Sequence, residues 1–221
     1  MPVRRLADGH EARTEAVRVL LGGGVIALPT DTVYGIAVAL ATPGGIERLF
    51  AAKSRPPDKA IALLLAGADQ APEIGVMSAA ATALAGAFWP GGLTLVVPRR
   101  LDRPLPAALT GGADAPGAVA TVGLRVPNHA APRALAAAVG PLPTTSANRS
   151  GEPEARNAGE IERLLGNALD LILDGGPSLG GTASTVVDAT GETLRILREG
   201  AIPAAEIARS LESAGLPGVG R

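Results

Sequence analysis

The segment VIALPTDTVYGIAVALA (25–41) places a polar loop between two apolar runs, and this pattern decides the class of fold. The first run, 25–29, is apolar without interruption, which is typical of a strand buried on both faces. The residues before it, 11–21, carry a helical stripe of apolar side chains that ends at three glycines. After it, Thr42 and Pro43 form a helix start signal, and that helix is predicted to reach about Lys53. Alternating buried strands and helices predict an α/β domain.

The same alternation continues along the chain. Strands are predicted at 61–65, 93–99, 118–127 and 171–174, a strand end and loop at 141–148, and helices at 78–88, 129–140, 158–165 and 203–213. Two apolar runs joined around Gly191 predict a hairpin, and 101–117 is predicted to be a loop. Because crossover units and a hairpin occur together, we expect a single domain with a twisted, mixed, mostly parallel sheet flanked by helices. Its main part is expected at 1–202, with a closing helix and tail at 203–221 packed on it or trailing from it.

The composition excludes several classes of protein. The chain has 221 residues and 0 Cys, which excludes a disulfide scaffold, a thiolate nucleophile and a thiolate zinc site. Its 2 His lie far apart in the sequence, so neither a multi-histidine zinc site nor a histidine relay is expected. A net charge of -1 provides no overall basic field for nucleic acid. The start lacks a signal-peptide pattern, and Pro90 interrupts the uncharged stretch 74–98, so we expect a cytoplasmic protein without a membrane span.

Three familiar catalytic or nucleotide-binding motifs are incomplete. The segment GGPSLGGT (175–182) resembles a P-loop, but Gly181 stands where that motif requires Lys. No G-x-G-x-x-G follows a predicted strand, so the dinucleotide-binding fingerprint is absent. The SAN at 146–148 resembles one motif of serine β-lactamases, but the S-x-x-K that supplies their nucleophile is missing.

Polar segments lie at the ends of predicted strands and helices. They are Thr30-Asp31-Thr32, Lys53-Ser54-Arg55, Thr144-Thr145-Ser146-Ala147-Asn148 and Ser184-Thr185. In open α/β sheets, loops at strand ends converge on the ligand crevice. Cations combined with hydroxyl and amide donors suit a phosphate-bearing anion. These residues therefore predict an anion-binding α/β enzyme, with a nucleotide as a candidate ligand.

The cations and the S-x-N segment also have purely structural interpretations. Lys53 and Arg55 can be solvated residues at a helix C-terminus, where positive charge is favourable. Ser146 and Asn148 can be simple turn formers.

The remaining candidates have similar alternatives. Thr30, Thr32 and Ser184 can cap strand ends through local hydrogen bonds. Arg125 interrupts an apolar strand, which indicates a partner anion that is either structural or a ligand. His129 is expected to cap the following helix or to pack locally.

Taken together, these segments resemble the YrdC family, the threonylcarbamoyl-AMP synthases. The matching stretches run in the family's order from about residue 15 to 202: LPTDTVYGIA, KSRPPDKAIALL, FWPGGLTLVV, GLRVPNH, PTTSANRSGEP, GGTASTVVD and ILREGAI. The resemblance implies a twisted α/β sheet with a large concave cleft. It also implies a nucleotidyltransferase that condenses L-threonine, bicarbonate and ATP into L-threonylcarbamoyl-AMP and pyrophosphate. That reaction is the first step of N6-threonylcarbamoyladenosine formation at position 37 of tRNA, which a separate threonylcarbamoyl transferase complex completes.

The resemblance also implies roles for individual residues. Those that hold the ATP phosphates and carry the chemistry are Lys53, Arg55, Ser146 and Asn148. Thr94 and Arg198 help to bind the nucleotide. Those that orient threonine are Thr30, Thr144 and Ser184, and Arg125 either binds the threonine carboxylate or braces the site. Mg²⁺ is expected to accompany ATP. Many members carry Pro-Leu-Ile-x-His after the K-x-R segment, whereas this chain has AIALL at 60–64, without His.

Two other functions are compatible with the same resemblance. One is a binding module of the same fold that contacts RNA, with arginines such as Arg99, Arg100, Arg103 and Arg149 as contacts. The other is an enzyme that carbamoylates a different acceptor from carbamoyl-adenylate. The K-x-R and S-x-N segments favour nucleotide chemistry over pure RNA binding.

Overall fold

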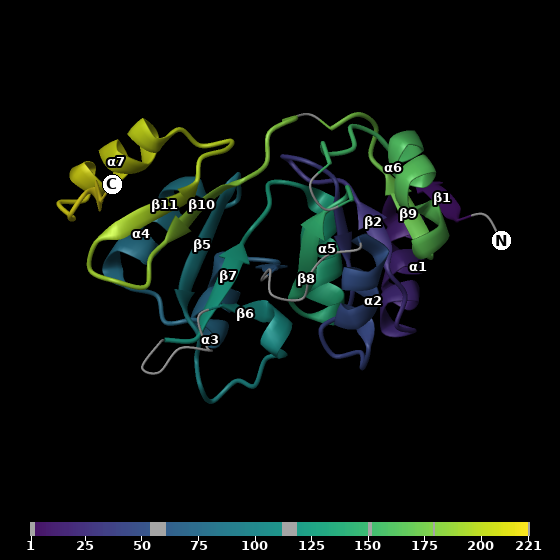
Figure 1. Cartoon of the computed structure of the whole chain (residues 1–221), viewed down its shortest axis with the longest axis horizontal. Helices are drawn as coiled ribbons and strands as arrows, with labels where there is room; N and C mark the ends of the chain where they lie inside the picture. Colours follow the sequence, from purple (N-terminus) through teal and green to yellow (C-terminus); the bar gives the residue numbers. More distant parts are fainter. Residues whose placement is uncertain (1–2, 54–60, 112–118, 150–151, 179, 221) are drawn as a thin grey trace.

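The strands of the chain join into one mixed sheet. The computed structural model describes residues 3–53, 61–111, 119–149, 152–178 and 180–220. Within these residues the strand order is β1-β9-β2-β3-β8-β4-β7-β5-β10-β11-β12, with β6 paired to β7 (Figure 1). The strands are β1 (Arg4–Ala7), β2 (Ile26–Leu28), β3 (Gly35–Ala37), β4 (Ala62–Leu64), β5 (Leu93–Pro98), β6 (Thr110–Gly111), β7 (Thr121–Arg125), β8 (Leu142–Ser146), β9 (Leu171–Asp174), β10 (Thr185–Asp188), β11 (Leu194–Arg198) and β12 (Val219–Gly220).

Helices pack on both faces of this sheet. They are α1 (His10–Leu21), α2 (Gly45–Lys53), α3 (Ala71–Ile74), α4 (Ala79–Phe88), α5 (Ala130–Val139), α6 (Ala158–Leu165) and α7 (Ala204–Ser213). Short 3₁₀ turns occur at Ala68–Gln70, Ala107–Leu109 and Gly166–Ala168. Figure 1 shows α1, α2, α5 and α6 gathered around the half of the sheet near the N-terminus, and α4 and α7 at the opposite end. This arrangement confirms the α/β domain with a mixed sheet.

The sheet separates two apolar clusters, because neighbouring residues of a strand point to opposite faces. Leu63 of β4 belongs to one cluster, with buried side chains of α2, α4, α6 and α7. Leu64 belongs to the other, where Leu20 of α1 and Leu135 of α5 pack on the sheet. On this second face, α1 contacts β2 and β9, and α5 contacts β4 and β8. The same face of β7, β5 and β10 lies beyond this helical cover.

The segment 25–41 forms a hairpin inside the sheet, with neighbouring strands on both sides. β2 pairs antiparallel with β3, with Ile26 opposite Ala37 and Leu28 opposite Gly35, so residues 29–34 form the connecting loop. β3 then pairs with β8, which brings this loop beside the S-x-N segment. Gly35 is required here, because a Cβ at this position would lie 2.7 Å from Cγ2 of Thr144.

Most predicted elements are confirmed, but the start of α2 is not. The predicted start signal at Thr42 and Pro43 precedes a helix that begins only at Gly45. Gly44 adopts a positive φ of 74°, which places a turn before the helix. The Thr42 hydroxyl donates to the carbonyl of Leu20 at 3.4 Å instead of capping the helix. A tertiary contact with the end of α1 has replaced the local cap.

The final helix contributes to the main core. Ile207 and Leu211 of α7 are fully buried, and α7 packs against α4. In the part of the chain that the structure describes, none of the helices is long and apolar enough to span a lipid bilayer.

Candidate active site

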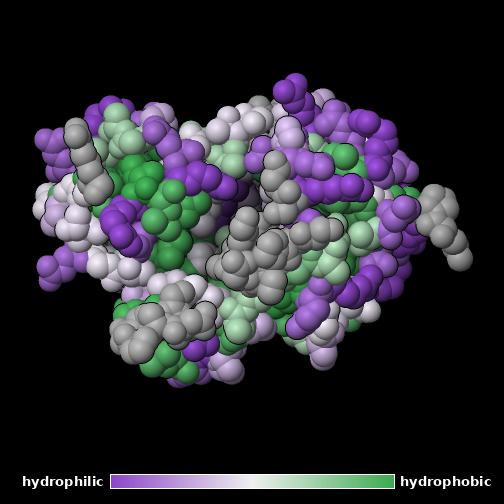
Figure 2. All heavy atoms as spheres, in the orientation of Figure 1, coloured by the Kyte–Doolittle hydropathy of each residue, from purple (hydrophilic) through white to green (hydrophobic). Residues whose placement is uncertain are grey.

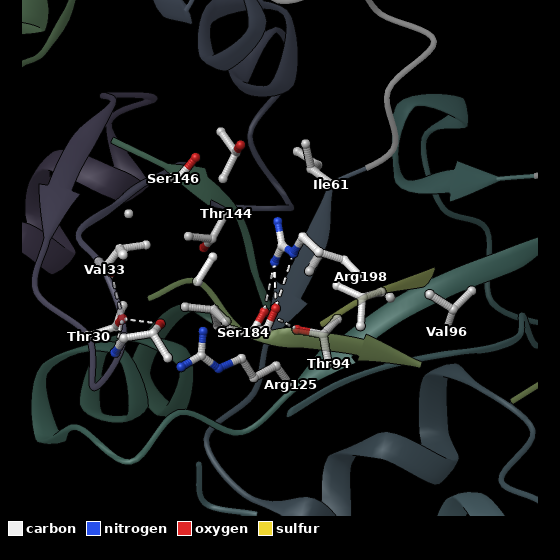
Figure 3. A pocket seen from close by; sticks show the side chains of 18 of the residues that line it. Thr30, Val33, Ile61, Thr94, Val96, Arg125, Thr144, Ser146, Ser184 and Arg198 are labelled. Carbon is white, nitrogen blue, oxygen red and sulfur yellow. Dashed lines mark hydrogen bonds between the residues drawn. The ribbon is translucent and has the colours of Figure 1, made fainter. Parts of the chain in front are cut away.

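A cavity of about 260 Å³ lies on the same face of the sheet as α1 and α5, in the area that these helices leave open. Its floor crosses six strands that are neighbours in the sheet, in the order β3, β8, β4, β7, β5 and β10. Figure 2 shows this side of the molecule hollowed near its centre, with hydrophilic residues beside the hollow. Figure 3 shows Thr30, Thr144 and Ser146 on one side of the pocket, Thr94, Val96 and Arg198 on the other, and Ser184 and Arg125 between them.

Lys53 joins the end of α2 to the end of β8. It is the last residue of α2 and only 2% exposed, so the interpretation as a solvated cation is wrong. Its Nζ donates to the carbonyl of Ser146 at 2.6 Å, and Ser146 Oγ and Asn148 Oδ1 each lie at 3.1 Å. Thr145 Oγ1 lies at 3.3 Å. The helix C-terminus favours the positive charge, and these oxygens replace the water that burial removes.

The S-x-N segment is also bonded internally. The Ser146 hydroxyl donates to Asn148 Oδ1 at 2.6 Å, and the Asn148 amide donates to the carbonyl of Glu152. Asn148 is buried, and its Oδ1 accepts from both Lys53 and Ser146. The segment is therefore a turn, as the structural interpretation stated, and this turn also holds a buried cation. We call Lys53, Ser146 and Asn148 the lysine cluster.

A second polar cluster lies across the cavity, and we call Thr94, Ser184 and Arg198 the arginine cluster. The Thr94 and Ser184 hydroxyl oxygens are 2.9 Å apart. The Arg198 guanidinium donates to the carbonyl of Ser184 at 2.7 Å from Nη2 and 3.2 Å from Nε, and to Ser184 Oγ at 3.2 Å. The parallel pairing of β10 with β5 and the hairpin of β10 with β11 bring these residues together. A guanidinium held in this way presents fixed donors at the cavity wall.

The partner anion of Arg125 is the carboxylate of Asp31 in the same chain. Its Nη2 donates to Asp31 Oδ1 at 2.7 Å and its Nε donates to the carbonyl of Gly91 at 3.0 Å. Burial lowers the pKa of the Arg125 guanidinium, Asp31 offsets part of this effect, and nearby Arg198 lowers the pKa further. The pair braces the loop of the β2–β3 hairpin against the end of β7. Arg125 also lines the cavity, so two arginines contribute positive potential to it.

Thr30 and Thr144 both line the cavity. The Thr30 hydroxyl donates to the carbonyl of Val33 at 2.6 Å and accepts from the Thr32 amide at 3.1 Å. The Thr144 hydroxyl donates to the carbonyl of Leu142 at 2.9 Å. The Thr30 hydroxyl also lies 3.1 Å from the Thr32 hydroxyl, so its hydrogen bonds are local, as the strand-end interpretation stated. The lone pairs of the Thr144 hydroxyl suit a ligand that donates hydrogen bonds.

A comparison with known proteins identifies the family. A family model described as "Telomere recombination", covering the Sua5, YciO and YrdC domain, matches residues 18–200. The chain belongs to this family.

Individual members of the Sua5/YciO/YrdC family resemble the chain over most of its length. The threonylcarbamoyl-AMP synthase of Pseudomonas entomophila is 37% identical over 191 residues, which are 82% of this chain and 95% of that protein. The structure of Pyrococcus abyssi Sua5 complexed with L-threonine matches with a TM-score of 0.86 and 30% identity. That match covers 99% of this chain and 62% of Sua5, so the chain spans about three fifths of that protein. E. coli YciO matches with a TM-score of 0.80 and 25% identity, over 93% of this chain and 97% of YciO.

Most of the residues that the family resemblance implied lie together in this fold. The predicted residues that line the cavity are Thr30, Thr94, Arg125, Thr144, Ser146, Ser184 and Arg198. Lys53 and Asn148 join them through their bonds to Ser146. Arg55 lies outside the described residues, so its place in the site stays a prediction.

The sequence analysis did not predict that Tyr34 holds two loops of the site together. Its hydroxyl donates to the carbonyl of Gly176 at 2.7 Å and accepts from the Gly175 amide at 3.0 Å. Burial raises the pKa of the Tyr34 phenol, so the hydroxyl keeps its proton. The side chain ties the Gly-rich loop after β9 to the hairpin loop that holds Thr30. A lone tyrosine in an otherwise aromatic-poor loop was the only sequence signal for this contact.

Sequence reasoning also missed the apolar floor of the cavity. Ala62, Gly123 and Val186 line it but carry no functional group that a motif search registers. The alternation of strand β7 was the available signal, because it places Gly123 on the same face as Arg125.

Proposed function

We propose that this protein condenses L-threonine, bicarbonate and ATP into L-threonylcarbamoyl-AMP and pyrophosphate. The observation that carries the proposal is that Ser146 of the lysine cluster and the whole arginine cluster line one cavity, with Lys53 hydrogen-bonded to Ser146. A cavity lined by Arg125 and Arg198, with the buried Lys53 next to Ser146 of its wall, suits a ligand with several negative charges. Relatives that bear the name threonylcarbamoyl-AMP synthase, and the threonine held by Pyrococcus abyssi Sua5, support this choice of substrates.

The reaction needs no histidine or cysteine. The amine of threonine attacks the carbon of bicarbonate, and water leaves to give a carbamate. One carbamate oxygen then attacks the α-phosphorus of ATP, and the bond from this phosphorus to the bridging oxygen breaks. Pyrophosphate leaves with that electron pair. The protein's contribution is to position the reactants and to neutralise charge as it moves onto the leaving group.

Side chains on two sides of the cavity position different parts of the substrates. Lys53 supplies a buried positive charge beside the Ser146 hydroxyl, which suits the phosphates. Arg198 and Thr94 hold the nucleotide at the other wall. The Thr144 hydroxyl accepts a hydrogen bond from the ammonium or hydroxyl group of threonine, and we also assign Thr30 and Ser184 to threonine, on the family resemblance. We also assign Arg55 to the phosphates, on the family resemblance.

Mg²⁺ is proposed to enter with ATP. Among the described residues, no group of three or more His, Cys, Asp or Glu side chains is arranged to hold a metal ion. Mg²⁺ commonly keeps several waters and binds through substrate phosphates, so the site suits an ion held mainly by the nucleotide. Such an ion supplies further neutralisation of phosphate charge.

The product is a mixed anhydride that must be passed to an acceptor. We propose that a separate transferase complex moves the threonylcarbamoyl group to the adenosine at position 37 of tRNA, in the cytoplasm. A carbamoyl transfer to a different acceptor is the alternative for the same chemistry.

The decisive experiment is threonine-dependent release of pyrophosphate from ATP, measured with and without bicarbonate. We expect release only when all three substrates are present, and we expect mass spectrometry to detect L-threonylcarbamoyl-AMP. Lys53→Met, which removes the charge and keeps the length of the side chain, is expected to lower this activity by about a hundredfold or more.

Arg18→Met is the matched control, because Arg18 is also a cation in the last turn of a helix but lies on α1, away from the cavity. Its activity should equal that of the wild type. Near-normal turnover of Lys53→Met, under conditions where both variants are folded by circular dichroism, would refute the role of the lysine cluster. If pyrophosphate is released at the same rate with and without threonine, the proposed reaction is refuted.

A further inference from the structure

The centre of the cavity floor carries the smallest side chains of the site. Ala62 on β4 and Gly123 on β7 are partners across a parallel pair of strands. Thr144 on β8 flanks Ala62, and Val96 on β5 flanks Gly123. All four of these residues line the cavity. The floor is therefore a row of residues across four strands with its lowest point at the centre.

The two polar clusters lie on opposite sides of this low point. Ser146 of the lysine cluster is on β8, whereas Thr94 of the arginine cluster is on β5. The sheet order between them is β8, β4, β7, β5. A ligand that contacts both clusters must therefore cross β4 and β7, and it passes over Ala62 and Gly123.

The fold does not require a glycine at position 123. A Cβ there would lie 3.6 Å from Ala62 and 3.7 Å from Cγ2 of Thr94, which are ordinary van der Waals distances. The residue lies inside a central strand, where glycine costs backbone entropy and contributes no packing. Gly35 differs, because its Cβ would lie only 2.7 Å from Thr144. A glycine inside a strand commonly marks a bulge, a tight bend, or the close approach of a ligand or another backbone. β7 pairs in regular register with β4 and β5 at Gly123, so there is no bulge here, and the close approach of a ligand explains the glycine.

We propose that Gly123 is a specificity-determining residue that sets the depth of the cavity. The bare backbone of β7 lets the middle part of a ligand, between its two polar ends, rest directly on the sheet. The class of ligand is a nucleotide joined to an amino-acid derivative, and this choice rests on the proposed function. A methyl group at position 123 raises the floor at the point where the ligand must cross.

The test compares Gly123→Ala with Gly86→Ala. Gly86 is an exposed position inside α4, and a Cβ there meets nothing within 4 Å. Both substitutions remove a flexible glycine, so both are expected to raise Tm by about 2–4 °C. Calorimetry with ATP and L-threonine is expected to show affinity for ATP weakened by about tenfold or more in Gly123→Ala only.

Each other outcome decides against the inference. Affinity for both ligands within twofold of the wild type in Gly123→Ala would overturn it. A lower Tm for Gly123→Ala would show that the fold itself needs this glycine, and would also overturn it. If the wild type binds neither ATP nor threonine, the proposed function is wrong and the inference falls with it. If the wild type binds both and Gly123→Ala binds equally well, only the inference fails.

Discussion

His129 caps a helix with an ionisable side chain. It is the N-cap of α5, and its Nδ1 accepts a hydrogen bond from the Ala131 amide at 3.1 Å. Burial lowers the pKa of the imidazole, and Arg13 adds to this, while Asp8 and Asp31 partly offset it. The sequence-based expectation of a capping histidine is confirmed. Protonation of Nδ1 would remove the acceptor that the cap requires.

This cap predicts a pH-dependent stability. The folded-state pKa of His129 lies below its unfolded value of about 6.5, so the unfolded chain binds more protons in the interval between them. The contribution is fully present above about pH 6.5 and is lost as the pH falls toward the folded pKa. The free energy of unfolding, measured with urea, should therefore decrease between about pH 7.5 and pH 5.5.

His129→Asn tests the origin of this dependence. Asparagine keeps an oxygen that can cap α5 but does not titrate. We expect its unfolding free energy to change less over the same pH interval than that of the wild type. An equal change in both proteins would mean that other groups cause the dependence.

Lys53 shows where inference from single residues succeeded and where it stopped. The family resemblance implied that Lys53, Ser146 and Asn148 act together, whereas their residue types alone left structural alternatives open. Whether Lys53 is solvated or buried depends on the contact between α2 and β8, which are far apart in the sequence. The role proposed for Gly123 could not be predicted from the sequence for a related reason, because it depends on the strands on either side of this residue.

Helix α4 depends on a single N-cap. The Ser78 hydroxyl oxygen accepts a hydrogen bond from the Ala81 amide at 3.1 Å. The helix is otherwise alanine-rich and has no acidic residue in its first turn. Ser78→Ala is therefore expected to lower the free energy of unfolding by about 1 kcal/mol, and Tm by about 2–4 °C.

Two further variants make the cap test specific. Ser78→Asp keeps an acceptor at the N-cap and should retain the stability of the wild type. Ser210→Ala makes the same substitution inside α7, where alanine is the better helix former, and should not lower Tm. A Tm for Ser78→Ala equal to that of the wild type would show that the cap is energetically unimportant.

The elements that sequence analysis missed are short or depend on partners. β1 has three exposed residues among four, so it lacks the apolar pattern of a central strand, and it exists because it pairs with β9. β6 and β12 have only two residues each and are defined by their neighbours β7 and β11. Long periodic helices and uninterrupted apolar strands were predictable because their pattern alone requires burial.

The C-terminal helix links the end of the chain to the body of the molecule. Ile207 and Leu211 of α7 are fully buried in the same cluster that contains α4 and the core strands. Leu211→Ala is expected to lower the free energy of unfolding by about 2–5 kcal/mol, because it leaves a cavity at this contact. Thermal and urea denaturation measure the change.

The matched control for this contact is Leu197→Ala, since Leu197 lies on β11 with 55% of its surface exposed. We expect a much smaller loss of stability for this variant. A similar small loss for Leu211→Ala would show that α7 is an appendage, and the division of the chain at residue 202 would then describe its cooperative unit.

The pattern of polar and apolar residues was sufficient to predict the class of fold, and seven matching stretches in their order along the chain indicated the family. The anion-binding role of the polar residue types stays a prediction. The fold class and the family follow from periodicity and from short segments whose order along the chain is visible without coordinates. The position of the cavity was not visible in this way. It arises because α1 and α5 cover only part of one face of the sheet, and the cavity lies on the rest of that face, from β3 across to β10. Tertiary contacts also decide the two clusters: Lys53 at the end of α2 meets Ser146 of β8, which lies 93 residues later in the chain. Arg198 reaches Ser184 because β10 and β11 pair as a hairpin.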